Sequence, residues 1–240
     1  MWITRHTHLS FVTLLTAVAI ALALYGPTLS TSAADKLPAP LSKYKGRRIA
    51  QTMSFHGAPW LIREERDQEE NTKLLLEALQ VKEGQTVADI GCGNGFYTLQ
   101  LARLVGPQGR VLAVDIQPEM LKLLNERASE AGIENIEPVL STPADPKLPA
   151  GEVDLVLLVD VYHEFAYPEQ MLRAMRKSLK PTGHVALAEY RMEDPSVPIK
   201  LLHKMSKKQI LEEYTASGFK LAREFDELPW QHLMFFGRSD

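Results

Sequence analysis

Short apolar runs alternate with helix-forming segments from residue 81 onward, and this alternation constrains the fold more than any other feature. We expect strands at 86–90, 111–114, 136–140, 153–160 and 185–190. Helical segments at 95–104, 118–131 and 168–178 separate them, joined by short links. Strand–helix alternation of this kind predicts an α/β fold, with a parallel sheet covered by helices on both faces. The final apolar segments, 219–225 and 232–237, predict an antiparallel pair that follows a helix capped by Ser206 and Gln209.

A glycine-rich turn, VADIGCGNGFYT at 87–98, follows the first predicted strand. Glycines at 91, 93 and 95 allow the backbone to approach a ligand closely and to enter a helix at once. A dinucleotide fingerprint needs glycine at its sixth position, where this chain has Phe96. The turn therefore disfavours a nicotinamide oxidoreductase. Its amides and the helix N-terminus still favour a small anion such as a carboxylate.

Acidic residues lie at the carboxyl ends of the predicted strands, where open α/β sheets bind their ligands. Asp89 precedes the glycine turn, and together they suit a group with both charges, such as an amino acid. Asp115 stands where an acid in nucleotide-binding sheets accepts hydrogen bonds from two ribose hydroxyls. It is also placed to cap the next helix. Asp145 and Asp160 follow the third and fourth strands. Asp145 also suits a simple turn between two prolines.

Taken in order, these segments resemble the class I S-adenosylmethionine-dependent methyltransferases. The motifs are VADIGCGNGFYTLQLA, GRVLAVDIQPEML, TPADPKLP, VDLVLLVDVYHEF and SLKPTGHVALAEY, over about 81–190. The resemblance implies a Rossmann-like, doubly wound sheet of seven strands, mostly parallel, with the last strand antiparallel. It implies S-adenosylmethionine as cofactor and methyl transfer by in-line displacement to a small-molecule or lipid-like acceptor. The alternative is a catalytically degenerate module that only binds this cofactor, although each cofactor position is chemically intact.

The resemblance also implies roles for particular positions. The methionine part would be held by Asp89, Gly91, Gly93, Asn94 and Gly95. Asp115 would bind the ribose, and Ile116 would pack on the adenine. Asp145 would accept from the adenine amino group, and Asp160 would lie beside the donor methyl group.

The segment VDVYHEF carries the candidate catalytic residues, His163 and Glu164. A histidine here would take a proton from a hydroxyl or phenol, because its pKa lies near neutral pH. The alternative is that both residues cap the next helix or orient the loop. The long connection 189–206, with Lys200 and His203, would either bind an anionic acceptor or be a solvated loop.

Composition excludes several other functions. The chain of 240 residues has 27 Lys and Arg against 30 Asp and Glu, so nothing indicates a nucleic-acid partner. Its one cysteine, Cys92, excludes an internal disulfide and a multi-cysteine metal site. It also argues against arsenite methylation, which needs several thiolates. No metal site is predicted, and the oligomeric state is not defined by the sequence.

The N-terminal 34 residues read as a targeting segment. Arg5 precedes an uncharged apolar run over 9–25, and Ser32-Ala33-Ala34 offers a small-residue cleavage site. A cleaved signal peptide and export are expected, with an uncleaved membrane anchor as the alternative. Residues 35–80 then form a tether and a helical cap, with a helix over 63–80, and residues 81–240 form the S-adenosylmethionine-binding domain. Export conflicts with a cofactor that is made in the cytosol.

Overall fold

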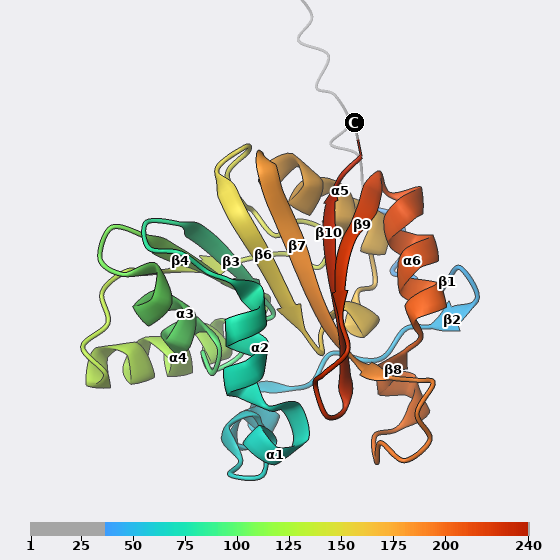
Figure 1. Ribbon diagram of the computed structural model, residues 1–240, viewed down its shortest axis with the longest axis horizontal. Coiled ribbons are helices and arrows are strands. Elements are labelled where there is room, and N and C mark those ends of the chain that lie inside the picture. The colour runs from blue at the N-terminus through green and yellow to red at the C-terminus, as the bar shows by residue number, and fades with distance from the viewer. Residues whose placement is uncertain (1–36, 240) are drawn as a thin grey trace, which may run out of the picture. The chain divides into compact units, whose positions relative to one another are not determined.

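A mostly parallel sheet forms the centre of the fold (Figure 1). The computed structural model describes residues 37–239, and within them the strand order is β5-β4-β3-β6-β7-β10-β9, with β8 beside β7. The strands are β3 (Thr86–Ile90), β4 (Arg110–Asp115), β5 (Ile136–Leu140), β6 (Val153–Val159), β7 (Leu179–Arg191), β8 (Lys204–Met205), β9 (Phe219–Phe225) and β10 (Gln231–Arg238).

The strand directions confirm the predicted Rossmann-like sheet. Strands β3, β4, β5, β6 and β7 pair in parallel, whereas β10 is antiparallel to both β7 and β9. The two-residue strand β8 is an addition that the sequence did not predict. The chain moves outward from β3 to β5 and then returns to place β6 on the other side of β3. Strand order therefore reverses at β3, which puts a ligand crevice at its carboxyl end.

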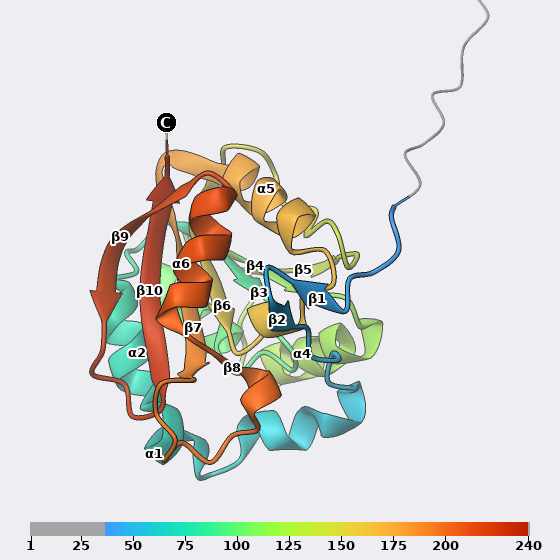
Figure 2. The same ribbon diagram turned by 90° about the vertical axis from the view of Figure 1, so that its right-hand side faces the viewer.

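Helices cover both faces of the sheet (Figure 2). On one face lie α2 (Thr72–Leu79), α3 (Thr98–Val105) and α4 (Pro118–Glu130), and on the other lie α5 (Pro168–Ser178) and α6 (Lys207–Ala216). Side chains alternate along β6: Leu155 and Leu157 face α2 and α3, while Val156 and Leu158 face α5. Such continuous apolar strands are typical of a sheet buried on both sides.

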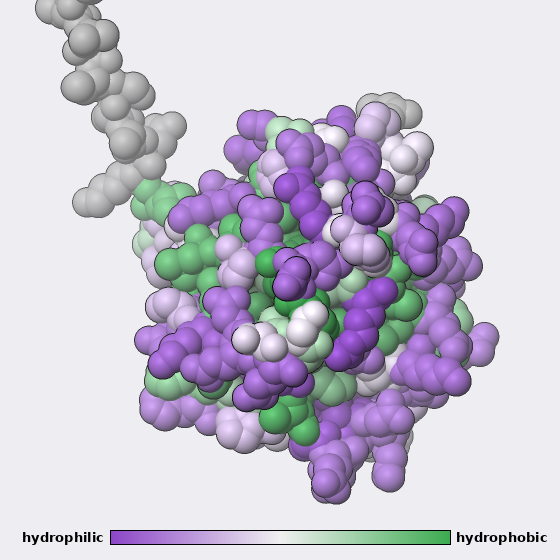
Figure 3. Space-filling model, turned by 90° about the vertical axis from the view of Figure 1, so that its left-hand side faces the viewer, coloured by the Kyte–Doolittle hydropathy of each residue, from purple (hydrophilic) through white to green (hydrophobic). Residues whose placement is uncertain are grey.

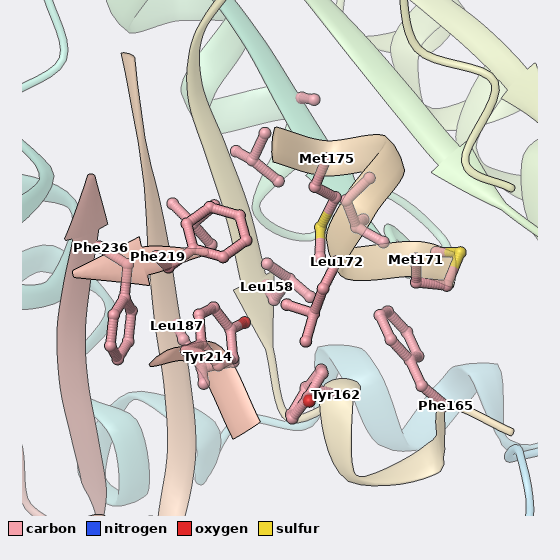
Figure 4. Packing of buried hydrophobic residues seen from close by; sticks show 14 of the residues in the cluster. Leu158, Tyr162, Phe165, Met171, Leu172, Met175, Leu187, Tyr214, Phe219 and Phe236 are labelled. Atoms are coloured by element: carbon pink, nitrogen blue, oxygen red, sulfur yellow. The ribbon is translucent and has the colours of Figure 1, made fainter. Parts of the chain in front are cut away.

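The core beneath α5 anchors the segment that follows β6. In Figure 4, Leu172 of α5 lies near Leu158 of β6, Met171 lies on the side of Phe165, and Tyr162 belongs to the same cluster. The Tyr162 hydroxyl donates to the Glu213 carboxylate at 2.6 Å, with no part of the tyrosine exposed. Tyr162 and Phe165 therefore hold the 3-10 helix η2 (Tyr162–Glu164) in place on either side of its polar pair, residues 163 and 164.

The predicted helix over 63–80 is wrong in one respect, because it is two helices. Helix α1 (Arg66–Glu70) and helix α2 are separated by Asn71, whose φ of 49° lies in the left-handed region. The Asn71 side chain accepts from the Leu74 N–H at 3.2 Å and so caps α2. Helix-forming composition alone did not reveal this break, since asparagine adopts the left-handed conformation as well as the right-handed helical one.

Three smaller elements precede α1. They are β1 (Lys43–Tyr44) and β2 (Arg47–Arg48), which pair antiparallel, and the 3-10 helix η1 (Phe55–Ile62). The surface of the described part of the chain is mixed in character. On the face shown in Figure 3, hydrophobic residues are scattered among hydrophilic ones. Among the helices of residues 37–239, none combines the length and the apolar character needed to span a membrane. The predicted signal segment, residues 1–34, lies outside the described residues.

Candidate functional site

A cavity of about 790 Å³ lies at the carboxyl ends of β3, β4 and β6. This volume is typical of small-molecule sites. The strand ends line one side of the cavity, and segments distant in sequence line the rest, including η1 and the connection 192–203. The crevice at the strand ends is thus a pocket to which many segments of the chain contribute.

The glycine turn brings the backbone to the cavity wall. Gly91 and Gly93 line it, with φ values of 70° and 54°. A Cβ on Gly91 would stand 2.4 Å from the Cγ2 of Val161, and one on Gly93 would stand 2.6 Å from the Cδ1 of Leu61. Gly95 is not part of the wall. Its missing Cβ makes room for Leu99 and Leu124, which pack α3 against α4.

Asp115 ends β4 and lies on the cavity wall. Its carboxylate accepts from the Gly93 N–H at 3.0 Å and from the Gln117 N–H at 2.9 Å. Burial raises the pKa of Asp115, while these amide hydrogen bonds lower it. The neighbouring Ile116 also lines the cavity and is 38% exposed, so it offers an apolar surface to a flat ligand.

Asp160 supplies an unsatisfied acceptor at the same cavity. Its Oδ2 accepts from the Gln231 side chain at 2.7 Å, whereas its Oδ1 is buried and has no hydrogen-bond partner within residues 37–239. Burial raises the pKa of Asp160 well above its usual range, and the Glu70 and Glu189 carboxylates raise it further. Asp160 also adopts a φ of 51°. An orphaned buried oxygen of this kind favours a ligand that carries a cationic N–H donor.

Besides Gly95, three predicted cofactor residues lie behind the wall or outside it. Asp89 accepts from the Thr98 hydroxyl at 2.6 Å, and burial raises its pKa to about 6. Asn94 donates to the Ala58 carbonyl oxygen at 3.0 Å and so ties the turn to η1. Asp145 is exposed and accepts from a backbone amide in its own turn. Their contact with a cofactor stays a prediction.

Arg66 is a cavity residue that the sequence analysis missed. It is 5% exposed, and its guanidinium donates to Glu70 at 2.9 Å and to the Leu61 carbonyl oxygen at 2.6 Å. Glu70 in turn accepts from the hydroxyls of Tyr97 and Tyr190. No local pattern marks Arg66, because its position depends on a helix break and on strands far along the chain.

Histidine and glutamate side chains occupy another part of the cavity wall. Both predicted catalytic residues, His163 and Glu164, line it together with His203. His163 Nδ1 lies 2.7 Å from Glu189, and His163 Nε2 lies 3.0 Å from the Nδ1 of His203. Burial alone would lower the pKa of His163, but the Glu189 carboxylate raises it. Burial raises the pKa of Glu164 to about 7.

Apolar residues form much of the remaining wall. They come from η1, from the segment after η2 and from the connection before β8, and they include Trp60, Leu61, Phe165, Met171, Pro198 and Ile199. The cavity therefore combines a charged part at Asp160 and Arg66, a polar part at His163, and apolar surface. Such a site can hold a zwitterionic cofactor and an apolar second molecule side by side.

Comparison with known proteins identifies methyltransferase relatives. A family model described as a methyltransferase domain matches residues 81–230. The demethylmenaquinone methyltransferase of Listeria monocytogenes serotype 4a is 28% identical over 126 residues, 52% of this chain and 52% of that protein. The ubiquinone/menaquinone biosynthesis C-methyltransferase of Azotobacter vinelandii is 32% identical over 119 residues, 49% of this chain and 47% of that protein. The chain spans about half the length of these curated relatives.

Solved structures share the fold. A SAM-dependent methyltransferase from Aquifex aeolicus has a TM-score of 0.72 at 24% identity, covering 77% of this chain and 98% of that one. A putative type 11 methyltransferase from Sulfolobus solfataricus has a TM-score of 0.60 at 21% identity, covering 72% and 94%. At these identities the likeness shows the fold alone.

Proposed function

The chain belongs to the class I S-adenosylmethionine-dependent methyltransferases, and we propose that its cavity holds the cofactor beside a small apolar acceptor to which the methyl group passes directly. The observation that carries this proposal is the unsatisfied Oδ1 of Asp160, next to a cavity that also contains Arg66. The cofactor's amino acid end bears one positive and one negative charge. Asp160 suits the ammonium group, and Arg66 suits the carboxylate.

The rest of the cofactor fits the strand ends. Asp115 is fixed by two backbone amides, which leaves its remaining lone pairs for the ribose hydroxyls. Ile116 and Met120 offer apolar surface for the adenine, and Ser141 and Thr142 supply polar groups at its edge. Asp145 stands outside this wall, so we assign contact with the adenine edge to Ser141 and Thr142 instead.

Bound there, S-adenosylmethionine supplies a methyl group already activated by its sulfonium. The protein's task is to align the acceptor with that methyl group, and alignment of this kind supplies about 7–11 kcal/mol. The acceptor's new bond to the methyl carbon would replace the carbon–sulfur bond, and S-adenosylhomocysteine would be left. Phe165, Met171 and Ile199 would hold an apolar acceptor. His163 and Glu164 would meet its reacting end and handle the proton that it loses.

A calorimetric titration tests the cofactor site. We expect S-adenosylmethionine and S-adenosylhomocysteine to bind, and NAD not to bind. Asp115→Ala and Asp160→Asn should each weaken binding by about tenfold or more, a loss of about 1.4 kcal/mol. Glu126→Gln, an exposed carboxylate on α4, is the matched control and should bind normally. Preferential binding of NAD, or unchanged affinity in both variants, would contradict the proposed site.

Export is a separate proposal that rests on residues 1–34 alone. Their apolar run and small-residue motif favour a cleaved signal, and an exported enzyme would meet lipid-like acceptors at a membrane. Fusing residues 1–40 to a reporter that is active only outside the cytosol tests this reading. Reporter activity supports export, and its absence, with the fusion protein detected in the cytosol, refutes it.

A further inference from the structure

Three side chains with metal-binding atoms converge on the polar part of the cavity. His163 and Glu164 belong to η2, and His203 ends the 3-10 helix η3 (Leu201–His203) just before β8. One ligand atom from each residue lies within 4.8 Å of the other two. All three residues line the cavity. Elements 40 residues apart in the chain therefore place two imidazoles and a carboxylate around one point.

The hydrogen bonds of His163 determine which of its ring nitrogens carries the proton. One Glu189 oxygen lies 2.7 Å from Nδ1, and the other accepts from the backbone N–H of His163 at 3.1 Å. Glu189 is completely buried. A carboxylate accepts, so the neutral ring carries its proton on Nδ1 and presents a lone pair at Nε2. This carboxylate–histidine pairing is the arrangement that orients histidine ligands in metal sites.

The lone pair of His163 points to a second imidazole. His203 Nδ1 lies 3.0 Å from His163 Nε2, and the two rings are nearly perpendicular, at 87°. Nitrogens of two metal ligands approach each other to about this separation around one ion with bonds of about 2.0–2.1 Å. Met53 N–H holds the Glu164 carboxylate in this neighbourhood. The arrangement thus leaves a third ligand group on the same side as the two imidazoles.

The surrounding charge also favours a cation. Two carboxylates, those of Glu164 and Glu189, face the imidazoles. The guanidinium of Arg47 donates to the His163 carbonyl oxygen, but it is paired with Glu213 through contacts of 2.6 and 3.1 Å. Its charge is therefore already balanced. A divalent ion at the three ligands would offset the two carboxylates that remain.

We propose that His163, Glu164 and His203 bind a Zn²⁺ ion, and that this ion binds a hydroxyl oxygen of the acceptor. Two histidines and one glutamate are a donor set of catalytic zinc sites, which keep a further position open for water or substrate. Oxygen-seeking ions such as Mg²⁺ suit this set poorly. Because all three residues line the cavity, an open position on the ion would face it. The acceptor class is accordingly an apolar molecule with an acidic hydroxyl, such as a phenol.

The part of the proposal that concerns the acceptor rests on the proposed function, whereas the metal site does not. Coordination to Zn²⁺ lowers the pKa of a bound hydroxyl, whose proton leaves to solvent. His163 and Glu164 then act as metal ligands, in place of the proton-accepting role that the proposed function gives them without the ion. The resulting oxygen anion attacks the methyl carbon, an oxygen–carbon bond forms, and the carbon–sulfur bond breaks. Charge and atoms balance, because the sulfonium becomes a neutral thioether as the anion becomes an ether.

Metal binding is measured on the full chain, purified without a histidine tag and stripped with a chelator. We expect one Zn²⁺ per chain by elemental analysis and titration, and Co²⁺ in its place should give the d–d absorption of a low-coordinate nitrogen–oxygen site. Catechol, used as a hydroxyl-bearing probe, should shift those bands. Mg²⁺ should not compete.

Variants assign the ligands. His203→Ala and Glu164→Gln should each weaken Zn²⁺ binding by about tenfold or more, whereas His56→Ala, which alters an exposed histidine outside the cavity, should not. S-adenosylhomocysteine binding serves as the fold control for each variant. Failure to bind one Zn²⁺, or equal affinity in the wild type and His203→Ala, overturns the metal site and leaves a hydrogen-bonded histidine pair. If the wild type does not bind S-adenosylhomocysteine, the proposed function is refuted instead.

Discussion

At the scale of single residues, the turn after β3 depends on the absence of one side chain. Gly91 has a φ of 70°, and a Cβ there would stand 2.4 Å from the Cγ2 of Val161. Gly132 has a similar φ of 64° but nothing within 4 Å. Comparing alanine variants at the two positions therefore separates the effect of backbone conformation from the effect of crowding beside the cavity.

We expect Gly132→Ala to lose about 1 kcal/mol of unfolding free energy, because alanine is strained at positive φ, and Gly91→Ala to lose more, because crowding against Val161 is added. Only Gly91→Ala should also weaken S-adenosylhomocysteine binding, by about tenfold or more, since Val161 must move. Denaturant unfolding and calorimetry measure the two effects. Equal cofactor affinity in both variants would show that crowding at the turn has no effect on the site.

Asp89 makes stability depend on pH. Its pKa is raised from 3.8 to about 6 by burial, against the Thr98 hydrogen bond. A raised acid pKa means that the native chain holds the proton more tightly than the unfolded chain. The contribution of Asp89 to stability is therefore fully present below pH 4 and is lost as the pH rises through 6.

Asp89→Asn removes this dependence. We expect the variant to gain stability relative to the wild type between pH 4 and pH 8, by up to about 3 kcal/mol. Denaturant unfolding at both pH values measures the change, and Glu126→Gln, at an exposed site, should show none. A difference between variant and wild type that stays constant with pH would contradict the raised pKa.

At the scale of elements, one buried carboxylate connects α1 to the sheet. Glu70 is completely buried and accepts from Arg66 of α1, from Tyr97 before α3 and from Tyr190 of β7. Arg66 lines the cavity. The position of the proposed carboxylate-binding group therefore depends on the packing of three elements around one acid.

Glu70→Gln should leave Arg66 without its charge partner and cost about 3–5 kcal/mol of unfolding free energy. The exposed pair of Lys73 and Glu77 on α2, 3.9 Å apart, provides the control. Glu77→Gln should cost less than about 1 kcal/mol. Urea unfolding of both variants measures the difference, and similar midpoints would mean that the buried network contributes little.

At the scale of the whole molecule, the cavity joins segments from most of the chain. Residues from 40 to 203 line it, and they come from both sides of the sheet's switch point at β3. A ligand bound there contacts elements that otherwise meet only through the core. Binding should therefore stabilise the entire unit and not one loop.

S-adenosylhomocysteine at about one hundred times its dissociation constant should add about 2.7 kcal/mol. For a unit of this size the gain raises the Tm by about 5–10 °C. Differential scanning calorimetry measures the shift in a single transition, with NAD at the same concentration as the control. An equal shift with NAD would argue against selective cofactor binding.

Much of the fold follows from local sequence. The strands at 86–90 and 136–140 and the helix at 168–178 have the predicted bounds, because apolar periodicity, proline at a helix start and glycine at a turn act over a few residues. Asp115 ends β4 and lines the cavity, because the carboxyl ends of parallel strands meet at one edge of the sheet.

Only the tertiary structure decided which side chains meet. The local sequence predicts the same kind of cofactor contact for Asp89, Asp145 and Asp160, yet only Asp160 lines the cavity. The direction of a side chain at a strand end depends on what packs around it. The pairing of His163 with Glu189 and His203 joins residues 26 and 40 positions apart. No short-range signal encodes such contacts, because they arise when the sheet brings separate loops to one edge.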